Sequence, residues 1–208
     1  MDAWIKEARM AVFSPGFRGR RRTTNPALPP GQYEEHGFPV LSAGITPRIR
    51  EDDWRFTLTT TAGESREWSW AEMMALGPEP ISTDIHCVTS WSKFGTSWRG
   101  VSVDRFLDAA GADAPFVMAG CYGGYTTNLP MEDVRGGKAW IAFEFDGEPL
   151  RPEHGGPARL LVPHLYFWKS AKWVNSLTLM EHDRAGFWES LGYHMHGDPW
   201  LEERYRSA

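Results

Sequence analysis

The alternation of apolar and polar residues predicts a chain built largely of short strands. Residues 54–61, WRFTLTTT, put three large apolar side chains on one face of an extended segment. Residues 139–145, AWIAFEF, and residues 174–180, VNSLTLM, are further strand patterns rich in aromatic and branched residues. Asp146 and Gly147 form a hairpin turn signal after the first of these. The pattern therefore favours a fold that is rich in β-structure.

Two short segments with helical signals lie between the strand patterns. Ser69 is placed to cap a helix over residues 70–76, with Glu72 at the third position as its partner in a capping box. Residues 103–110, VDRFLDAA, predict a second helix that Gly111 closes. Strands throughout with short helices between them indicate a single mixed α+β domain.

Two further strand predictions lead into loops that could carry chemistry. Residues 116–119 read as a short buried strand that delivers Cys121 into a glycine-containing loop, residues 121–130. Residues 159–162 form another strand that Pro163 stops. We expect the loops beside these strands to emerge at the edges of a sheet.

The first part of the chain differs from the rest. Residues 2–13 have an amphipathic helical pattern, and residues 14–37 are rich in Pro, Gly and Arg without a period. We expect an arm there that is either disordered or wrapped around the domain. The arginines within residues 18–22 are interpreted as a solvated patch, with a phosphate contact as the alternative. We divide the chain into an N-terminal helix and arm (1–37) and a folded domain (38–208).

Composition narrows the classes of function. The chain of 208 residues has 11 Trp, 15 Pro and 21 Gly, which is typical of a loop-rich fold with aromatic packing. A net charge of −5 argues against general nucleic-acid binding. No stretch approaches the roughly 20 apolar residues that span a bilayer, and no secretory or twin-arginine signal is recognisable. We therefore expect a cytoplasmic protein with no membrane contact.

Residues 83–98, TDIHCVTSWSKFGTSW, surround one thiol with polar and aromatic side chains. We predict a short extended stretch that leads into an irregular loop. With His86 beside it and Lys93 downstream, Cys87 could be a thiolate at neutral pH, and thiolates are nucleophiles and ligands of soft metals. The alternative is a buried cysteine that acts as a small hydrophobic residue. Cys87 and Cys121 alone cannot form a metal cage.

Three loops, residues 83–98, 121–130 and 154–173, can converge on one site because each lies next to a short strand. Together they offer the thiol of Cys87, the phenol of Tyr125, the guanidinium of Arg159, the ammonium groups of Lys169 and Lys172, and the imidazole of His154. This set suits an anionic ligand that carries phosphate, with a soft metal at the thiol. Glycines 155 and 156 would let the backbone approach a bulky cofactor.

Several motifs carry a resemblance to a known family. IHCVTSWS with WRGVSV, YTTNLP, and GEPLRPEHGGPARLLVPHLYFWKSAKWV resemble the molybdopterin-binding domain of the sulfite oxidase family. The chain is most similar to short, haem-free bacterial sulfite oxidase-like proteins, relatives of the methionine-sulfoxide reductase catalytic subunit. The resemblance covers about residues 28–205. It implies the mixed-sheet fold of that family and a cofactor of molybdenum and molybdopterin.

The resemblance also implies roles for individual residues. Cys87 matches the cysteine that ligates molybdenum and takes part in catalysis, and Tyr125 matches the active-site tyrosine. Residues 38–41 fall near an N-terminal segment that contacts the pterin. The remaining expected cofactor contacts are His86, Cys121, His154, Arg159, Lys169, Ser170, Ala171 and Lys172. Among these, we expect Cys121 to form part of the pocket wall.

The implied reaction is oxygen-atom transfer at molybdenum, on a small oxyanion, S-oxide or N-oxide, with an external electron-transfer partner. Thr89, Ser90 and Trp91 stand where animal sulfite oxidases carry arginines that help to bind sulfite, and Gly123 replaces an acidic residue of many short relatives. The alternatives are an S- or N-oxide reductase of the same fold and a non-catalytic protein that binds the cofactor. No dimerisation region is recognisable, which is compatible with a monomer.

His194 and His196 have a spacing that could suit a metal ion. Because no third ligand is evident beside them, we interpret this pair as surface structure.

Overall fold

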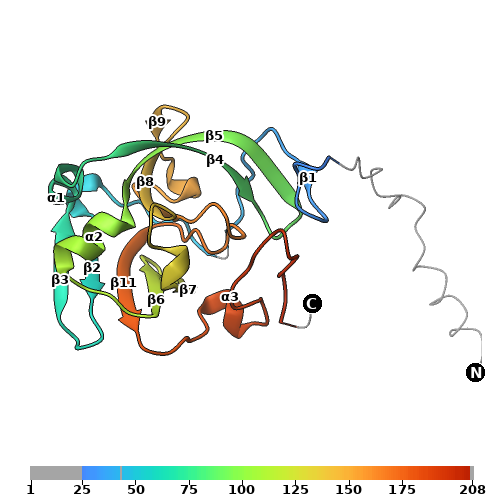
Figure 1. Ribbon diagram of the computed structural model, residues 1–208. Helices are drawn as coiled ribbons and strands as arrows, with labels where there is room; N and C mark the ends of the chain where they lie inside the picture. Colours follow the sequence, from blue (N-terminus) through green and yellow to red (C-terminus); the bar gives the residue numbers. More distant parts are fainter. Residues whose placement is uncertain (1–24, 43, 207–208) are drawn as a thin grey trace, which may run out of the picture.

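Two mixed β-sheets form the body of the protein in the computed structural model (Figure 1), which describes residues 25–42 and 44–206. The predicted helix over residues 2–13 and the arginines of residues 18–22 lie outside the described residues. Each sheet combines one parallel strand pair with antiparallel pairs, so the predicted mixed-sheet α+β class is confirmed.

The first sheet carries the segment around Cys87. Its strands are β1 (Tyr33–Glu34), β4 (Glu79–His86), β5 (Trp91–Ser102), β8 (Trp140–Phe145), β9 (Glu148–Pro149) and β10 (Arg159–Leu161). The order is β1-β5-β8-β10, with β4 paired to β5 and β9 paired to β8. Among the strand pairs that the structure describes in this sheet, β1–β5 is parallel and the others are antiparallel.

The second sheet packs its apolar side against the first. Its strands are β2 (Arg55–Thr59), β3 (Ser65–Ser69), β6 (Phe116–Cys121), β7 (Thr126–Pro130) and β11 (Val174–Met180). They follow the order β3-β2-β11-β6-β7, and β2 runs parallel to β11. Cys121 therefore lies at the end of β6, where it is paired with Val174 at the start of β11.

Three short α-helices occur in the described part of the chain: α1 (Trp70–Ala75), α2 (Val103–Ala110) and α3 (Phe187–Ser190). Ser69 and Glu72 form the predicted capping box of α1, and Gly111 ends α2 in the left-handed conformation with φ of 60°. Short 3₁₀ turns span Glu51–Asp53, Met131–Asp133 and Pro152–His154. No helix among the described residues has the length and hydrophobicity to cross a membrane.

The core has two parts because the first sheet is buried on both faces. Along β8, Ile141 and Phe143 belong to the main core between the sheets, whereas Trp140 and Ala142 face a second apolar cluster. This arrangement explains the nearly continuous apolar run of AWIAFEF, since both faces of the strand require apolar side chains. The second cluster contains Cys87 together with Trp91 and Trp98.

The predictions for the Cys87 region were wrong in one respect. Residues 83–98 do not form an irregular loop, because β4 and β5 form a long antiparallel hairpin around a tight turn at Cys87–Ser90. Strand β5 continues through residues 98–101 to Ser102. Gly100 is required within that strand, since a Cβ atom there would lie 2.7 Å from the carbonyl oxygen of Ile141.

The loop predicted over residues 121–130 is also shorter than expected. Its second half is strand β7, which pairs with β6, so the loop itself consists of residues 122–125. The strands predicted near residues 54–61, 139–145 and 174–180 are confirmed.

Candidate functional site

The turn between β4 and β5 positions Cys87. The amide nitrogens of Cys87 and Ser90 donate to the carbonyl oxygens of Trp91 and Cys87, at 2.8 and 3.0 Å, and close the turn. The thiol Sγ lies 3.1 Å from Oγ1 of Thr89. Burial raises the pKa of the Cys87 thiol above its ordinary value, against a smaller opposite effect of Thr89. Of the two alternatives that the sequence left open, burial of the thiol and its raised pKa favour a neutral, buried cysteine in the absence of a metal ion.

Arg159, at the start of β10, is a buried charge without a carboxylate partner. Its side chain is 1% exposed, and the residues that the structure describes place no acidic group in ion-pair contact with it. Nη1 and Nη2 donate to the carbonyl oxygens of His154 and Ser170, at 2.8 and 2.6 Å. The guanidinium carbon lies 4.0 Å from the ring centre of Phe167. Buried charges are normally paired, so this guanidinium indicates a site for an anion.

Both thiols lie near Arg159. Burial lowers the pKa of Arg159 to about 9. A negative charge on Cys121 would oppose this lowering most, followed by one on Tyr125 and then one on Cys87. Burial likewise raises the pKa of Cys121 to about 12, so this thiol is neutral at physiological pH. Cys87 and Cys121 are both free and buried. Cys121 belongs to the main core and Cys87 to the second apolar cluster, and both are close enough to Arg159 for a charge on either thiol to affect its pKa. The convergence of the three loops on one site stays a prediction.

His154 and Lys172 lie beside Arg159. The His154 ring stacks on Phe38, with centroids 4.0 Å apart, and its Nδ1 is buried without a hydrogen-bond partner. Burial, followed by the charge of Arg159, lowers the pKa of His154. Lys172 Nζ donates to the carbonyl oxygens of Leu41 and Glu153, at 2.7 and 2.6 Å, and burial lowers its pKa to about 8. These two groups add an available nitrogen and a second cation to the site.

The glycines beside His154 serve the protein's own packing. A Cβ atom on Gly155 would lie 3.1 Å from Cα of Lys172, and one on Gly156 would collide with the carbonyl oxygen of Leu150. The absence of side chains therefore lets this loop approach the neighbouring backbone, which fixes the positions of His154 and Lys172.

Lys169 differs from Lys172 because it is satisfied within the protein. Its Nζ lies 2.7 Å from Oε1 of Glu189, with both side chains fully buried, and it also donates to Asn128 and to the carbonyl oxygen of Met195. Nothing in this geometry supports the predicted contact between Lys169 and a cofactor.

Ser170 and Ala171 connect this loop to β10. Ser170 Oγ accepts a hydrogen bond from the amide of Val162 at 2.9 Å, and its carbonyl oxygen accepts the bond from Arg159. The carbonyl oxygen of Ala171 accepts from the amide of Leu160 at 2.8 Å. Both residues are buried, and their backbone holds Arg159 in place.

Tyr125 and His86 are each engaged by a neighbour. The Tyr125 hydroxyl donates to the carbonyl oxygen of Trp168 at 2.7 Å, and burial raises its pKa well above the ordinary value. His86 Nδ1 lies 2.8 Å from Oγ of Ser92, and burial lowers its pKa. The predicted catalytic role of Tyr125 and the cofactor contact of His86 stay predictions.

His194 and His196 belong to a network of ion pairs. His196 lies between Asp133, at 3.1 Å from Nε2, and Glu203, at 2.7 Å from Nδ1. The hydrogen bond to Asp133 is the main cause that raises the pKa of His196 to about 9. His194 lies 3.3 Å from the same carboxylate oxygen of Glu203. No group of three potential metal ligands occurs in the described part of the chain, and the contacts of both histidines with Asp133 and Glu203 are ion pairs within the protein.

Sequence reasoning missed three residues around the Cys87 turn, two of which contact it through their side chains. Gln32 Nε2 donates to the carbonyl oxygen of Cys87 at 3.1 Å. Arg204 donates to the carbonyl oxygen of Val88, and Tyr166 forms a parallel bridge with His86. Gln32 and Arg204 lie outside every motif named above, and Tyr166 lies within the motif of residues 147–174, where no role was assigned to it.

Comparison with known proteins identifies the family. Residues 43–188 match the model of the "Oxidoreductase molybdopterin binding domain" family. The chain is 38% identical to the "Uncharacterized oxidoreductase YuiH" of Bacillus subtilis over 181 residues, which cover 86% of this chain and 91% of that relative. It is also 29% identical to the putative protein-methionine-sulfoxide reductase subunit YedZ1 of Azospira oryzae, of which it spans 63%.

A solved structure supports the same fold. The chain superposes on the sulfane dehydrogenase SoxCD from Paracoccus pantotrophus with a TM-score of 0.60 and 20% identity, covering 66% of this chain and 40% of that one. At this identity the likeness concerns the fold alone. The family match covers Cys87, Cys121, Arg159 and Lys172. With these findings, the resemblance seen in the motifs is confirmed, and the chain belongs to the oxidoreductase molybdopterin-binding domain family, as a molybdenum-dependent oxidoreductase of the sulfite oxidase type.

Proposed function

We propose that Cys87 ligates the molybdenum of the bound cofactor and that the protein performs oxygen-atom transfer there. The observation that carries this proposal is the buried guanidinium of Arg159, which has no carboxylate partner among the described residues and lies near both thiols. An anionic cofactor satisfies that charge, whereas a purely structural arginine at such burial would need an acidic partner.

The residues present fit molybdopterin. Arg159 offers a planar set of donors for an anionic group, Lys172 offers a second positive charge, and the unpartnered Nδ1 of His154 offers one further hydrogen-bonding atom. Both cysteines are free and buried, and Cys87 is the one that lies at the tight turn between β4 and β5. We assign the metal to Cys87 and the pocket wall to Cys121.

The cofactor supplies the two-electron redox chemistry when it is bound. The chain's own contribution is binding and electrostatics. The Cys87 thiol must lose its proton on binding the metal, because a coordinating thiol is deprotonated by the charge of the ion. The Ser170 and His154 carbonyl groups hold the Arg159 side chain in one orientation, so its charge is preorganised.

We further propose a small-molecule substrate and an external electron-transfer partner, because redox turnover requires a second reactant to restore the metal. We propose the cytoplasm as the compartment, with two free cysteines as the supporting feature. Residues 38–208 form the proposed cofactor domain. Gln32 and the strand β1 also contact the Cys87 turn, so the segment from residue 25 contributes to the site.

The test is expression in cells that make molybdopterin, followed by metal and pterin analysis and a dye-coupled turnover assay. The proposal expects molybdenum and pterin bound in equal amounts, with turnover on an oxyanion, S-oxide or N-oxide. Protein that lacks molybdenum would refute it. Protein that holds molybdenum but turns over none of these substrates would instead support a non-catalytic carrier of the cofactor.

A further inference from the structure

Trp91, the first residue of strand β5, has a buried indole N–H without a hydrogen-bond partner. Its side chain is 4% exposed, and Nε1 has no acceptor among the described residues. Other indole nitrogens donate within the protein, namely those of Trp54, Trp98, Trp140, Trp168 and Trp173. A buried donor that stays unpaired destabilises the fold, and an acceptor that binds beside Trp91 would remove this cost.

Trp91 closes the turn that carries Cys87. Its carbonyl oxygen accepts a hydrogen bond from the Cys87 amide at 2.8 Å, and its backbone is paired with Tyr33 of β1. Cys87 and Trp91 also belong to the same buried apolar cluster. Pairing on both sides therefore fixes the position of the indole next to the proposed metal ligand.

The Trp91 ring borders two phenylalanines that also contact the site around Arg159. Phe38 lies edge-on to Trp91, with centroids 6.4 Å apart, and stacks on His154. Phe167 lies edge-on to Trp91 at 6.5 Å, and its ring centre is 4.0 Å from the guanidinium carbon of Arg159. Phe38 and Phe167 thus connect Trp91 with the groups that we assign to the cofactor.

His154 provides a second, independent observation. Its Nδ1 is buried and has no hydrogen-bond partner among the described residues, so two open atoms lie on rings that contact Phe38. Arg159 is a buried cation without a carboxylate partner in the described part of the chain. Because buried polar groups are nearly always satisfied, three open groups around one aromatic cluster indicate a ligand with several acceptor atoms.

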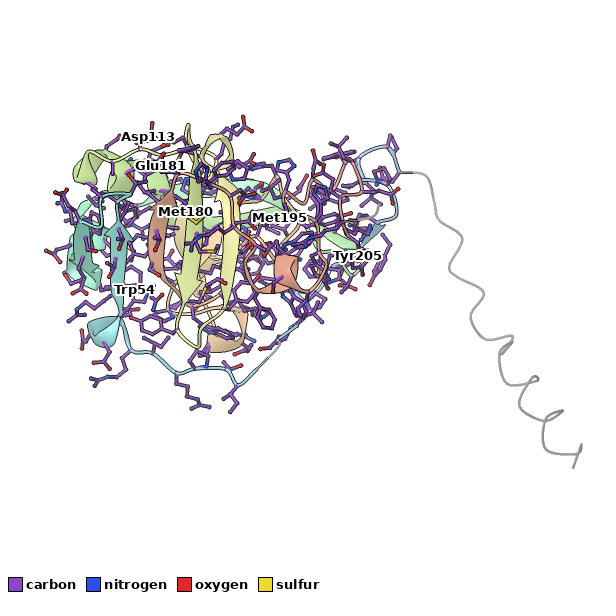
Figure 2. All side chains as sticks on the ribbon, turned by 90° about the horizontal axis from the view of Figure 1, so that it is seen from below. Trp54, Asp113, Met180, Glu181, Met195 and Tyr205 are labelled. Carbon is purple, nitrogen blue, oxygen red and sulfur yellow. The ribbon has the colours of Figure 1, made fainter. Side chains whose placement is uncertain are left out.

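An unpartnered indole elsewhere in the protein lacks these neighbours. Trp68 Nε1 is also buried without a partner among the described residues, but Trp68 belongs to the main core, where Phe56 contacts both Trp68 and Trp54. In Figure 2, Trp54 lies toward one end of the molecule and Tyr205, from the segment that contacts the Cys87 turn, lies toward the other. The open donor of Trp68 therefore does not belong to the proposed site.

Resting on the proposed function, we propose that the indole N–H of Trp91 donates a hydrogen bond to the metal end of the bound cofactor. Arg159 and Lys172 serve its anionic end, whereas Trp91 lies beside Cys87. An indole is an uncharged donor, so it directs the cofactor without adding a charge. A donor next to the metal stabilises the more negative, reduced state. Trp91 therefore helps to retain the cofactor and raises its reduction potential.

The test compares Trp91→Phe with two matched variants, all loaded in cells that make molybdopterin. Phenylalanine keeps an aromatic ring but has no N–H group. Trp98→Phe removes an indole of the same cluster whose N–H already donates to Thr96 at 2.8 Å, and Trp68→Phe removes an unpartnered indole of the main core. The readouts are the rate of pterin loss on dialysis and the midpoint potential of molybdenum from a titration followed by electron paramagnetic resonance.

Trp91→Phe should lose the pterin about threefold to tenfold faster than the parent, as expected for one hydrogen bond, and its midpoint potential should be lower. Trp98→Phe and Trp68→Phe should match the parent in both readouts. In the cofactor-free protein, Trp98→Phe should unfold at a lower urea concentration than Trp91→Phe, because only Trp98 loses an internal hydrogen bond.

The outcomes separate this proposal from the proposed function. A parent that holds no molybdenum would refute the proposed function and the Trp91 contact with it. A loaded parent with Trp91→Phe unchanged in both readouts would overturn the Trp91 contact alone, and so would either effect without the other. Equally strong changes in a matched variant, or the lowest urea midpoint in Trp91→Phe, would show a packing role and also overturn the proposal.

Discussion

Replacement of Arg159 by Gln should change the stability of the cofactor-free protein little but should strongly weaken the binding of the cofactor. In the cofactor-free fold the guanidinium is a buried charge whose pKa is lowered to about 9 from 12.5. One pKa unit corresponds to about 1.4 kcal/mol, so this lowering of the pKa means that the buried charge destabilises the folded state by roughly 5 kcal/mol. The pKa of Arg159 is lower in the folded than in the unfolded protein. The destabilisation is therefore fully present below pH 9, and it disappears as the pH rises from about 9 to 12.5.

The two hydrogen bonds of Arg159 to the carbonyl oxygens of His154 and Ser170 act in the other direction. Bonds from a charged donor contribute about 1.5–3 kcal/mol each. The two effects nearly cancel, so Arg159→Gln should change the unfolding free energy of the cofactor-free protein by at most about 2 kcal/mol. Urea denaturation at pH 7.5 measures this difference.

The loaded protein should respond strongly to the same change. Loss of a charged contact to the cofactor should remove about 3 kcal/mol of binding free energy, or roughly a hundredfold in affinity. Arg159→Lys should fall between the parent and Arg159→Gln, because a lysine keeps the charge but loses the planar donor set. The assay is molybdenum and pterin per protein after extended dialysis.

Arg151→Gln provides the matched control. Arg151 is exposed in the same loop, and its replacement also removes one positive charge near the site. It should retain the cofactor like the parent. Equal retention in Arg159→Gln and the parent would refute the reasoning, because the buried guanidinium would then have no role in binding an anion.

Three further predictions concern stability and can be measured by urea denaturation. Glu189→Ala leaves the fully buried Lys169 without its partner and should cost about 3–5 kcal/mol. Ser69→Ala removes the capping box of α1 and should cost about 1 kcal/mol, whereas a loss below about 0.2 kcal/mol would show that the cap is unimportant. His196 has a pKa raised to about 9, so its stabilisation is fully present below pH 6.5 and is lost as the pH rises through about 9. The difference between the parent and His196→Asn should therefore shrink by about 1 kcal/mol from pH 6 to pH 10, a figure discounted because the side chain is 35% exposed. A difference that is constant with pH would contradict this last prediction.

Local signals in the sequence predicted those elements whose ends are fixed by single residues. The pair Ser69 and Glu72, and the stop at Gly111, determine where α1 and α2 begin or end, and the structure agrees with both. Strand β5 was missed because its middle, around residues 95–97, carries Gly, Thr and Ser. Its extended conformation comes from pairing with β4 on one side and β8 on the other, which no local pattern contains.

The site was predictable to a similar degree. The motif around Arg159 predicted that this residue binds an anion. The burial of Arg159 without an acidic partner among the described residues supports that interpretation. Lys169 and Lys172 looked equivalent in sequence, but Glu189, which follows far along the chain, neutralises only Lys169. Tyr166 and Arg204 acquire their positions near Cys87 through tertiary contacts alone. Such contacts between distant segments leave no periodic or motif signal.

The most direct test of the central claim is X-ray absorption spectroscopy at the molybdenum edge of the loaded protein. If Cys87 ligates the metal, the parent and Cys121→Ser should both show three sulfur ligands, two from the pterin dithiolene and one from Cys87. Cys87→Ser should show two, because a hydroxyl oxygen is a harder ligand and cannot replace the thiolate sulfur. Three sulfur ligands in Cys87→Ser, or two in Cys121→Ser, would contradict the assignment.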